Sequence, residues 1–238
     1  MTATLPPASS SRVRDIVLRI AAVPATAAVV LLGIWVAGGV ISDDFRTSMA
    51  LTAAWFGLAA CGCAIVAWRV RALRAPVLIA YAVTAVAAGG YLGLTTLRDR
   101  VVDERVVTGV PQAGAAGMPR TGRVAAEEPA VPVEVARGRF RSHEHATRGR
   151  AAVVRLPDGR RFLTLTSFAT SPGPDLRVRL VRGDSADGGA EGNVDLGALK
   201  GNRGDQQYEI PQSARVGDRT VVIWCRAFSA PFGSARLT

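Results

Sequence analysis

Three long apolar segments in the first 97 residues constrain this chain more than any other feature of its sequence. They cover residues 20–41, 49–68 and 76–97, and none of them contains Asp, Glu, Lys or Arg. Within residues 20–97, charged residues occur only in the short loops between the segments. Each is about 20 residues long, the length that an α-helix needs to cross about 30 Å of hydrocarbon. A cleaved signal peptide has a shorter apolar core, so the first segment is predicted to be retained. The sequence therefore predicts three transmembrane helices within residues 16–97.

Arginines around these segments predict the orientation of the protein in the membrane. Six of them flank the start of the first span and the end of the second, namely Arg12, Arg14, Arg19, Arg69, Arg71 and Arg74. The loop between these two spans holds only Arg46. Because Arg and Lys in short loops favour the cytoplasmic side, the tail of residues 1–15 is predicted to be cytoplasmic. The arrangement therefore predicts a multi-pass protein of the cell membrane whose C-terminal region lies outside the cytoplasm.

Residues 98–136 have the composition of a linker. They are rich in Pro, Ala and Gly and show no sustained periodicity. The linker is expected to hold the following domain away from the bilayer, and its first residues, LRDRVVDERVV, are expected to extend the third helix by a turn or two.

The composition changes again at residue 137, where short alternating segments begin. Strands are expected at residues 150–156, 160–168, 176–181, 208–210, 220–228 and 232–237. Between the first two lies Pro157-Asp158-Gly159, a sequence typical of a hairpin turn. Residues 137–238 are therefore predicted to form an all-β domain, a sandwich or barrel-like fold, outside the cytoplasm.

The net charge of +10 does not indicate a nucleic-acid-binding protein. Lys200 is the only lysine among 29 basic residues, so the excess is an arginine bias of the whole chain. In residues 176–180 the arginines alternate with apolar residues, as on the solvated face of a sheet. We therefore expect the lipid bilayer, and no nucleic acid, among the partners.

Cys225, in the sequence VVIWCRAF, is the residue most open to a chemical role. Cys61 and Cys63 lie within the second span and are predicted to be small packing residues. Cys225 then has no partner in its own chain, which is typical of a free thiol, a metal or haem ligand, or an intermolecular disulfide. A fourth interpretation also stays open, because a buried cysteine packs like a small apolar residue beside Val221 and Ile223.

His143 and His145 are the two histidines of the chain, in the sequence SHEH. On a strand both rings would project to one face, where they could bind a metal, but two ligands alone are a weak signal. If His145 approaches Cys225, the two could form a thiolate–imidazole pair or ligate one iron or copper ion. The spans contain no His, Asp, Glu, Lys or Arg, which disfavours a haem relay or an ion pathway within them.

The β region contains a series of short sequence elements. In chain order they are Gly138-Arg139-Phe140, His145, Gly149, Ser167-Phe168, Gly173-Pro174-Asp175-Leu176, residues 196–206 (LGALKGNRGDQ), Tyr208-Glu209-Ile210-Pro211, Val222-Ile223-Trp224-Cys225 and residues 228–233. Together, over residues 137–238, they resemble the DM13 domain family.

The resemblance implies a β-rich extracellular module in electron transfer, of the kind found beside DOMON or cytochrome b561-like domains. In that family a characteristic cysteine is proposed to act as a thiol or to bind a group such as haem, and it corresponds to Cys225. The histidine-free spans depart from the cytochrome-containing arrangements.

Two hypotheses follow. In the first, a membrane-anchored DM13-like domain has a redox role centred on Cys225, assisted by His145, with haem, copper or no cofactor, and with a redox partner protein. In the second, the β domain is a non-catalytic module that binds a cell-envelope ligand or protein, and Cys225 is a core residue. No G-x-S-x-G, P-loop, CxxC or HExxH sequence is present, so whether the protein is an enzyme stays open.

Overall fold

The computed structural model describes residues 8–42, 44–111 and 131–238. The chain forms two compact units, Met1–Leu94 and Thr95–Thr238. The first unit is helical, and the second consists of strands and loops after the last three residues of the third helix. Three apolar helices followed by a β-rich domain confirm the predicted fold class.

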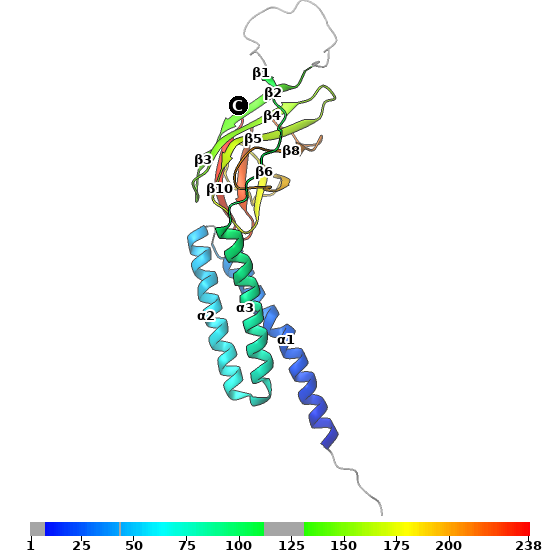
Figure 1. Ribbon diagram of the computed structural model, residues 1–238, viewed down its shortest axis with the longest axis vertical. Coiled ribbons are helices and arrows are strands. Elements are labelled where there is room, and N and C mark those ends of the chain that lie inside the picture. Colours follow the sequence, from blue (N-terminus) through cyan, green and yellow to red (C-terminus); the bar gives the residue numbers. More distant parts are fainter. Residues whose placement is uncertain (1–7, 43, 112–130) are drawn as a thin grey trace, which may run out of the picture. The chain divides into compact units, whose positions relative to one another are not determined.

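The helical unit contains three long α-helices, which Figure 1 labels α1 to α3. Their bounds are α1 Ala8–Gly39, α2 Phe45–Arg69 and α3 Arg74–Leu97, with a short 3₁₀ helix at Arg71–Leu73. All three are long and apolar enough to cross a membrane. Helix α1 begins inside the segment assigned to the tail, whereas residues 1–7 lie outside the described residues.

Polar groups on these helices bond to neighbouring backbone. The indole N–H of Trp55 donates to the Val30 carbonyl at 3.1 Å, and the Tyr81 hydroxyl donates to the Phe56 carbonyl at 2.8 Å. A Cβ atom at Gly33 would overlap the Trp55 ring, so only glycine lets α1 and α2 approach this closely. Such pairing matters in hydrocarbon, where no water can satisfy a polar group.

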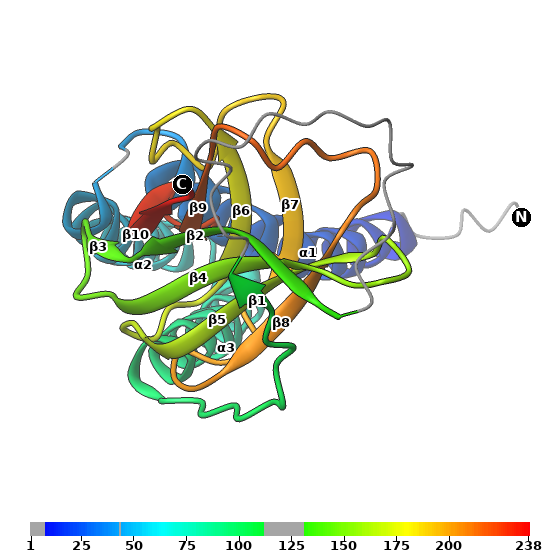
Figure 2. The ribbon, with the colours of Figure 1, turned by 90° about the horizontal axis from the view of Figure 1, so that it is seen from above.

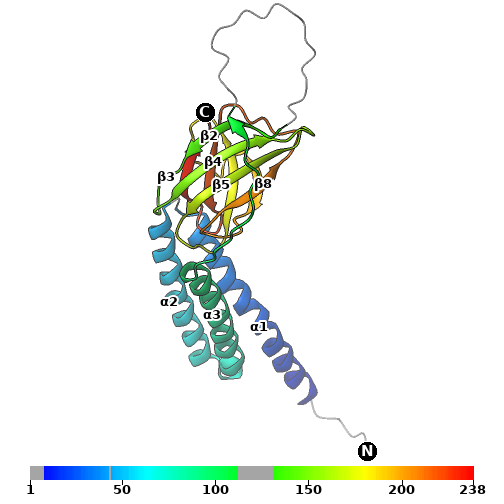
Figure 3. The ribbon, with the colours of Figure 1, turned by 45° about the horizontal axis from the view of Figure 1, so that its top comes forward.

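The β unit is a sandwich of two five-stranded sheets. The strands are β1 Val110–Pro111, β2 Val133–Arg139, β3 Arg141–Ser142, β4 Arg148–Arg155, β5 Arg161–Ala169, β6 Leu176–Arg182, β7 Val194–Ala198, β8 Gln206–Ile210, β9 Arg219–Cys225 and β10 Ala230–Arg236. The first sheet has the order β1-β2-β4-β5-β8, and the second has the order β3-β10-β9-β6-β7. Figure 2 shows the two layers from above, and Figure 3 shows the first sheet in front.

The core lies between the two sheets. Leu163 and Leu165 of the first sheet, and Val178, Leu180 and Ile223 of the second, are fully buried. At one edge the sheets are joined by paired backbone bonds, from the Arg137 N–H to the Thr238 carbonyl at 3.0 Å and from the Thr238 N–H to the Arg137 carbonyl at 2.9 Å. This closure gives the sandwich a partly barrel-like edge.

All six predicted strands are present, with ends shifted by up to three residues. The largest shift is in β9, which ends at Cys225 and not at residue 228, because residues 226–229 turn the chain into β10. Four strands were not predicted. Two of them, β2 and β7, have the sequences VEVARGR and VDLGA, which contain few large apolar residues, and the other two, β1 and β3, are only two residues long.

The first part of the predicted linker belongs to the β unit. Residues 99–109, here called the strap, connect the end of α3 to β1 and contain no helix or strand, apart from an isolated bridge between Val101 and Arg203. Their backbone N–H groups bond to the domain, as from Val102 to the Arg203 carbonyl at 2.9 Å and from Glu104 to the Asp205 carbonyl at 2.8 Å. Helix α3 ends at Leu97, so the expected extra helical turns are absent from residues 98–108. Residues 112–130 of the predicted linker lie outside the described residues. Its last residues are not linker, because β2 begins at Val133, four residues before the predicted domain boundary.

Candidate functional site

Cys225 is the last residue of β9, the strand at the centre of the second sheet. It is paired with Leu176 of β6 on one side and with Ala230 of β10 on the other. Its side chain is 0% exposed. Because alternate residues of a strand share a face, it lies on the same face as the fully buried Ile223. The thiol is therefore part of the sandwich core, next to the turn that begins at Arg226.

Two opposing effects act on this thiol. Burial raises the pKa of Cys225 from 9.0 to about 11, because a thiolate is poorly solvated in the core. Backbone hydrogen bonds from Phe228, Asp175 and Ala227 act in the opposite direction and lower the pKa by favouring the thiolate. The nearby Asp175 charge raises it slightly. The thiol is therefore protonated at neutral pH, and the backbone hydrogen bonds from Phe228, Asp175 and Ala227 offset only part of the cost of burial.

The Gly-Pro-Asp-Leu sequence forms one wall around Cys225. The Asp175 carbonyl accepts the Arg226 N–H at 2.9 Å, and the Asp175 carboxylate binds the Arg226 guanidinium at 2.6 Å and that of Arg177 at 3.2 Å. A Cβ atom at Gly173 would lie 3.0 Å from the Phe232 ring, so glycine lets this turn pack closely against the core. Two sequence elements about 50 residues apart thus meet at one thiol.

The structure separates the two histidines. Strand β3 ends at Ser142, so the SHEH residues form a bend, and the expected common strand face is absent. The His143 Nε2 atom lies 2.8 Å from the Ser234 hydroxyl. The His145 ring lies 3.9 Å, centre to centre, from the Phe232 ring. The pairing of His145 with Cys225 stays a prediction.

The surroundings of Cys225 do not fit a bound haem or copper ion. A metal–thiolate bond needs an accessible sulfur and further ligands beside it. Cys225 is fully buried. Within the described ranges, no group of three or more His, Cys, Asp or Glu side chains is placed to hold a metal ion. Thiol exchange is a candidate chemical role of Cys225 that requires neither haem nor copper.

The sequence LGALKGNRGDQ forms a second site, which binds the strap. The Asn202 side chain accepts the Arg100 N–H at 2.6 Å and donates to Asp99 at 2.7 Å. A Cβ atom at Gly201 would lie 2.5 Å from the Arg100 carbonyl, and one at Gly204 would overlap the Val102 carbonyl. Gly204 also has a φ of +97°, a conformation that other residues rarely adopt. Gly201 has no positive φ, so only the close approach of the strap requires glycine there.

Charge pairing reinforces this contact. The Lys200 ammonium lies 2.7 Å from the Glu104 carboxylate of the strap, and the Gln207 N–H donates to the same carboxylate at 3.0 Å. Burial raises the pKa of the Glu104 carboxyl, but the hydrogen bonds from Lys200 and Gln207 and the Lys200 charge outweigh this effect, so the pKa is lowered. Sequence reasoning missed the strap because its partners lie about 100 residues away in the chain.

Comparison with known proteins assigns the β unit to one family model. Residues 139–237 match the model described as "Electron transfer DM13". The predicted resemblance is thereby confirmed for the domain that follows the three helices. The chain has no match among the curated proteins or the solved structures with which it was compared.

Proposed function

We propose that this protein is a membrane-anchored electron-transfer module whose DM13 domain lies outside the cytoplasm and works through the thiol of Cys225. The observation that carries this proposal is the meeting of two DM13 sequence elements at the sulfur. The Gly-Pro-Asp-Leu turn and the turn after Trp224-Cys225 both direct backbone N–H groups at it. Such groups stabilise a thiolate once the cost of burial is relieved.

In this proposal the turn of residues 226–229 acts as a gate. Opening of the turn would expose the sulfur, lower its pKa toward the ordinary value and allow the proton to leave to solvent. The thiolate would then attack a disulfide of a partner protein. An S–S bond forms between Cys225 and one partner sulfur, the partner's own S–S bond breaks, and its second sulfur leaves as a thiolate that takes up a proton.

The location follows from charge. Arginines in the short flanks of α1 and α2 favour a cytoplasmic N-terminus, and three spans then put the β unit on the other side. An oxidising compartment would supply disulfide-bearing partners. The helices would serve as the anchor in the bilayer.

The gate can be tested by thiol exchange in the full-length protein. Replacing Cys61 and Cys63 by Ala leaves Cys225 as the only thiol. We expect 5,5′-dithiobis(2-nitrobenzoate) to label it at a rate that hardly changes with low concentrations of urea, because local opening of a turn exposes little surface. One thionitrobenzoate should be released per chain.

A matched control places the thiol elsewhere on the same strand face. Val221 is also 0% exposed and is paired with Leu180 and Ala235, away from the turn. In a Val221→Cys, Cys225→Ser variant, labelling should require global unfolding and should accelerate steeply with urea. Equal urea dependence for the two thiols would show that Cys225 has no gate of its own and would reject the redox proposal.

The second hypothesis, a binding module with Cys225 as a core residue, is favoured by the complete burial of this side chain. It predicts that a Cys225→Ala variant loses about 1 kcal/mol of unfolding free energy. It also predicts that the variant keeps every binding property of the wild type, and that the wild-type thiol reacts only after unfolding.

A further inference from the structure

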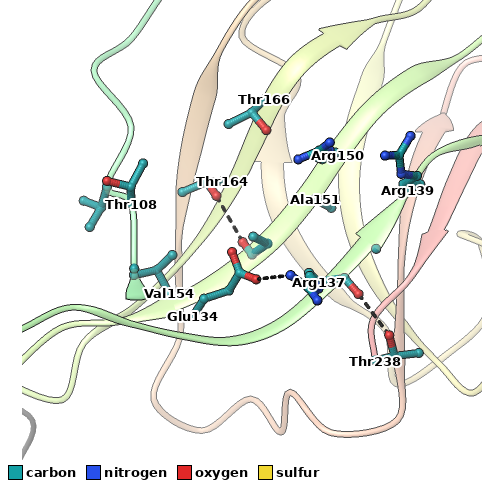
Figure 4. A pocket seen from close by; sticks show the side chains of 14 residues that line it. Thr108, Glu134, Arg137, Arg139, Arg150, Ala151, Val154, Thr164, Thr166 and Thr238 are labelled. Atoms are coloured by element: carbon teal, nitrogen blue, oxygen red, sulfur yellow. Dashed lines mark hydrogen bonds and ion pairs between the residues drawn. The ribbon is translucent and has the colours of Figure 1, made fainter. Parts of the chain in front are cut away.

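The outer face of the first sheet carries a pocket that the redox proposal does not use. It lies in the β unit and has a volume of about 630 Å³, within the usual range for small-ligand sites. Its floor is formed by β4 and β5, one flank by β2 and another by residues 107–109 of the strap. Figure 4 shows Thr108 on the strap facing the sheet, with Arg139 and Arg150 on the opposite side of the view.

The strap reaches both edges of this sheet. The Val107 N–H donates to the Gln207 side chain on β8 at 2.9 Å, and Val110 pairs with Val133 of β2. Because β8 and β2 lie on either side of β4 and β5, the strap crosses above these two central strands. Contacts between distant parts of the chain therefore form one wall of the pocket, which is open to solvent at Arg139 and Arg150.

The charged groups of the pocket are predominantly positive. Its lining contains Arg137, Arg139 and Arg150 against one carboxylate, Glu134. The Arg137 guanidinium lies 3.7 Å from Glu134, so this pair is partly neutralised. In the part of the chain that the structure describes, no ion pair or hydrogen bond engages the side chains of Arg139 and Arg150.

These two arginines stand directly opposite each other on neighbouring strands, since Arg139 of β2 is in register with Arg150 of β4. Like charges at directly opposed positions destabilise a sheet. On the second sheet, by contrast, Arg177 and Arg179 share the carboxylate of Asp195. The arginine pair of the first sheet is thus an unneutralised concentration of charge, as expected where an anion binds.

Hydroxyl groups continue the same row across the sheet. Thr166 of β5 is in register with Arg150, and Thr164 lies further along β5, opposite Ala152. Both threonines line the pocket, as does Thr108 of the strap. Guanidinium groups bind carboxylate or phosphate through two parallel hydrogen bonds, whereas threonine hydroxyls both donate to and accept from neighbouring hydroxyl groups.

We propose that this pocket binds the phosphate or carboxylate group of a small hydroxylated ligand, such as a sugar phosphate or a sugar acid. Arg139 and Arg150 hold the oxyanion, and Thr108 and Thr166 hold the hydroxyl groups beside it. The Thr164 hydroxyl is buried and donates to the Ala152 carbonyl at 3.3 Å, so it shapes the floor of the pocket. The site lies on the sheet opposite the one that carries Cys225. Its occupancy is therefore independent of thiol chemistry, and a Cys225→Ser variant should bind the same ligands.

The test is calorimetric titration of the full-length protein in detergent with glucose 6-phosphate, glucuronate, inorganic phosphate and glucose. We expect glucose 6-phosphate and glucuronate to bind at least five-fold more tightly than inorganic phosphate, and glucose to give no signal. Raising the salt concentration should weaken the binding of all three anions. Inorganic phosphate binding as tightly as glucose 6-phosphate would overturn the role of the threonines and identify free phosphate as the ligand.

The deciding variant is Arg139→Gln combined with Arg150→Gln, which should weaken the binding of glucose 6-phosphate at least ten-fold. Its unfolding temperature should be equal to or higher than that of the wild type, because the opposed charges are removed. Arg148→Gln is the matched control, since Arg148 lies on the same strand but outside the pocket. Absence of binding by the wild type, or equal binding by the double variant, would overturn the proposal.

Discussion

Cys225 and Tyr208 are buried acids whose neutral forms the fold favours. Burial raises the pKa of Cys225 to about 11, and it also raises the pKa of Tyr208 above its ordinary value. As the pH rises, the unfolded chain loses each proton before the folded protein does. The contribution of each group to the unfolding free energy is therefore complete at a pH below its pKa in the unfolded chain. It is lost as the pH rises toward the pKa of the same group in the folded protein.

The first prediction is a loss of stability in alkali that depends on Cys225. At pH 10, one pH unit above the ordinary thiol pKa of 9.0, Cys225 should have lost about 1.4 kcal/mol of its contribution to the unfolding free energy. A Cys225→Ser variant should show a flatter decline between pH 8 and pH 10. A Tyr208→Phe variant should be less stable at every pH, because it loses the hydrogen bonds with the Lys200 N–H and the Gln206 side chain. The slope of its stability against pH should differ from that of the wild type from about pH 10 upward, where an unfolded tyrosine is at least half ionised.

Unfolding of the β unit can be followed through Trp224, which is the tryptophan of that unit. Replacing Trp35, Trp55 and Trp68 by Phe in every variant removes the signal of the helices. Urea titrations at each pH then give the free energies. An identical pH dependence for the wild type and the Cys225→Ser variant would contradict the burial argument.

At the scale of elements, the strap and the loop of residues 196–206 pack against each other and hold each other in place. The strap could not approach this loop if either Gly201 or Gly204 carried a side chain. Two glycines that suggest only a flexible turn in the sequence therefore have a packing role. The DM13 sequence element around them holds the segment that follows the membrane helices.

The second prediction concerns Gly204→Ala. The new Cβ atom would meet the Val102 carbonyl, and the residue would be strained at a φ of +97°. We expect a loss of about 2 to 4 kcal/mol in unfolding free energy. Amide hydrogen exchange should also accelerate at Val102 and Glu104, whose N–H groups bind the loop.

Gly217→Ala is the matched control, because open space surrounds that position. It should change the unfolding free energy by less than about 0.5 kcal/mol. Unchanged exchange at the strap in Gly204→Ala would mean that the strap is held without this close approach.

For the whole molecule, the arginine distribution predicts that the N-terminus and the β unit lie on opposite sides of the membrane. In a variant with Cys61 and Cys63 replaced by Ala, an added Ser213→Cys thiol is exposed on the β unit. It should react with a membrane-impermeant maleimide in intact cells. A Thr2→Cys thiol should react only after permeabilisation. Labelling of Thr2→Cys but not Ser213→Cys in intact cells would reverse the proposed orientation.

The sequence alone was sufficient for features that depend on short stretches of chain. Helix length and hydropathy identified the three helices, and alternation identified six strands, because burial imposes a period on neighbouring residues. The DM13 sequence elements also pointed to Cys225 as the residue most open to chemistry. The ends of β9 and the strands β2 and β7 were less predictable, because their limits are set by pairing with distant strands.

Only the tertiary structure decided what surrounds each candidate residue. It buried Cys225 between β6 and β10, put the His145 ring against Phe232 and brought the strap across the first sheet. It also set Arg139 opposite Arg150, although about ten positions separate the two in the sequence. Such contacts form because folding of the whole domain lowers its free energy. They cannot be predicted from the helix or strand propensity of short segments. The chain thus specifies its elements locally, whereas the environment of the thiol and the anion pocket arise from long-range packing.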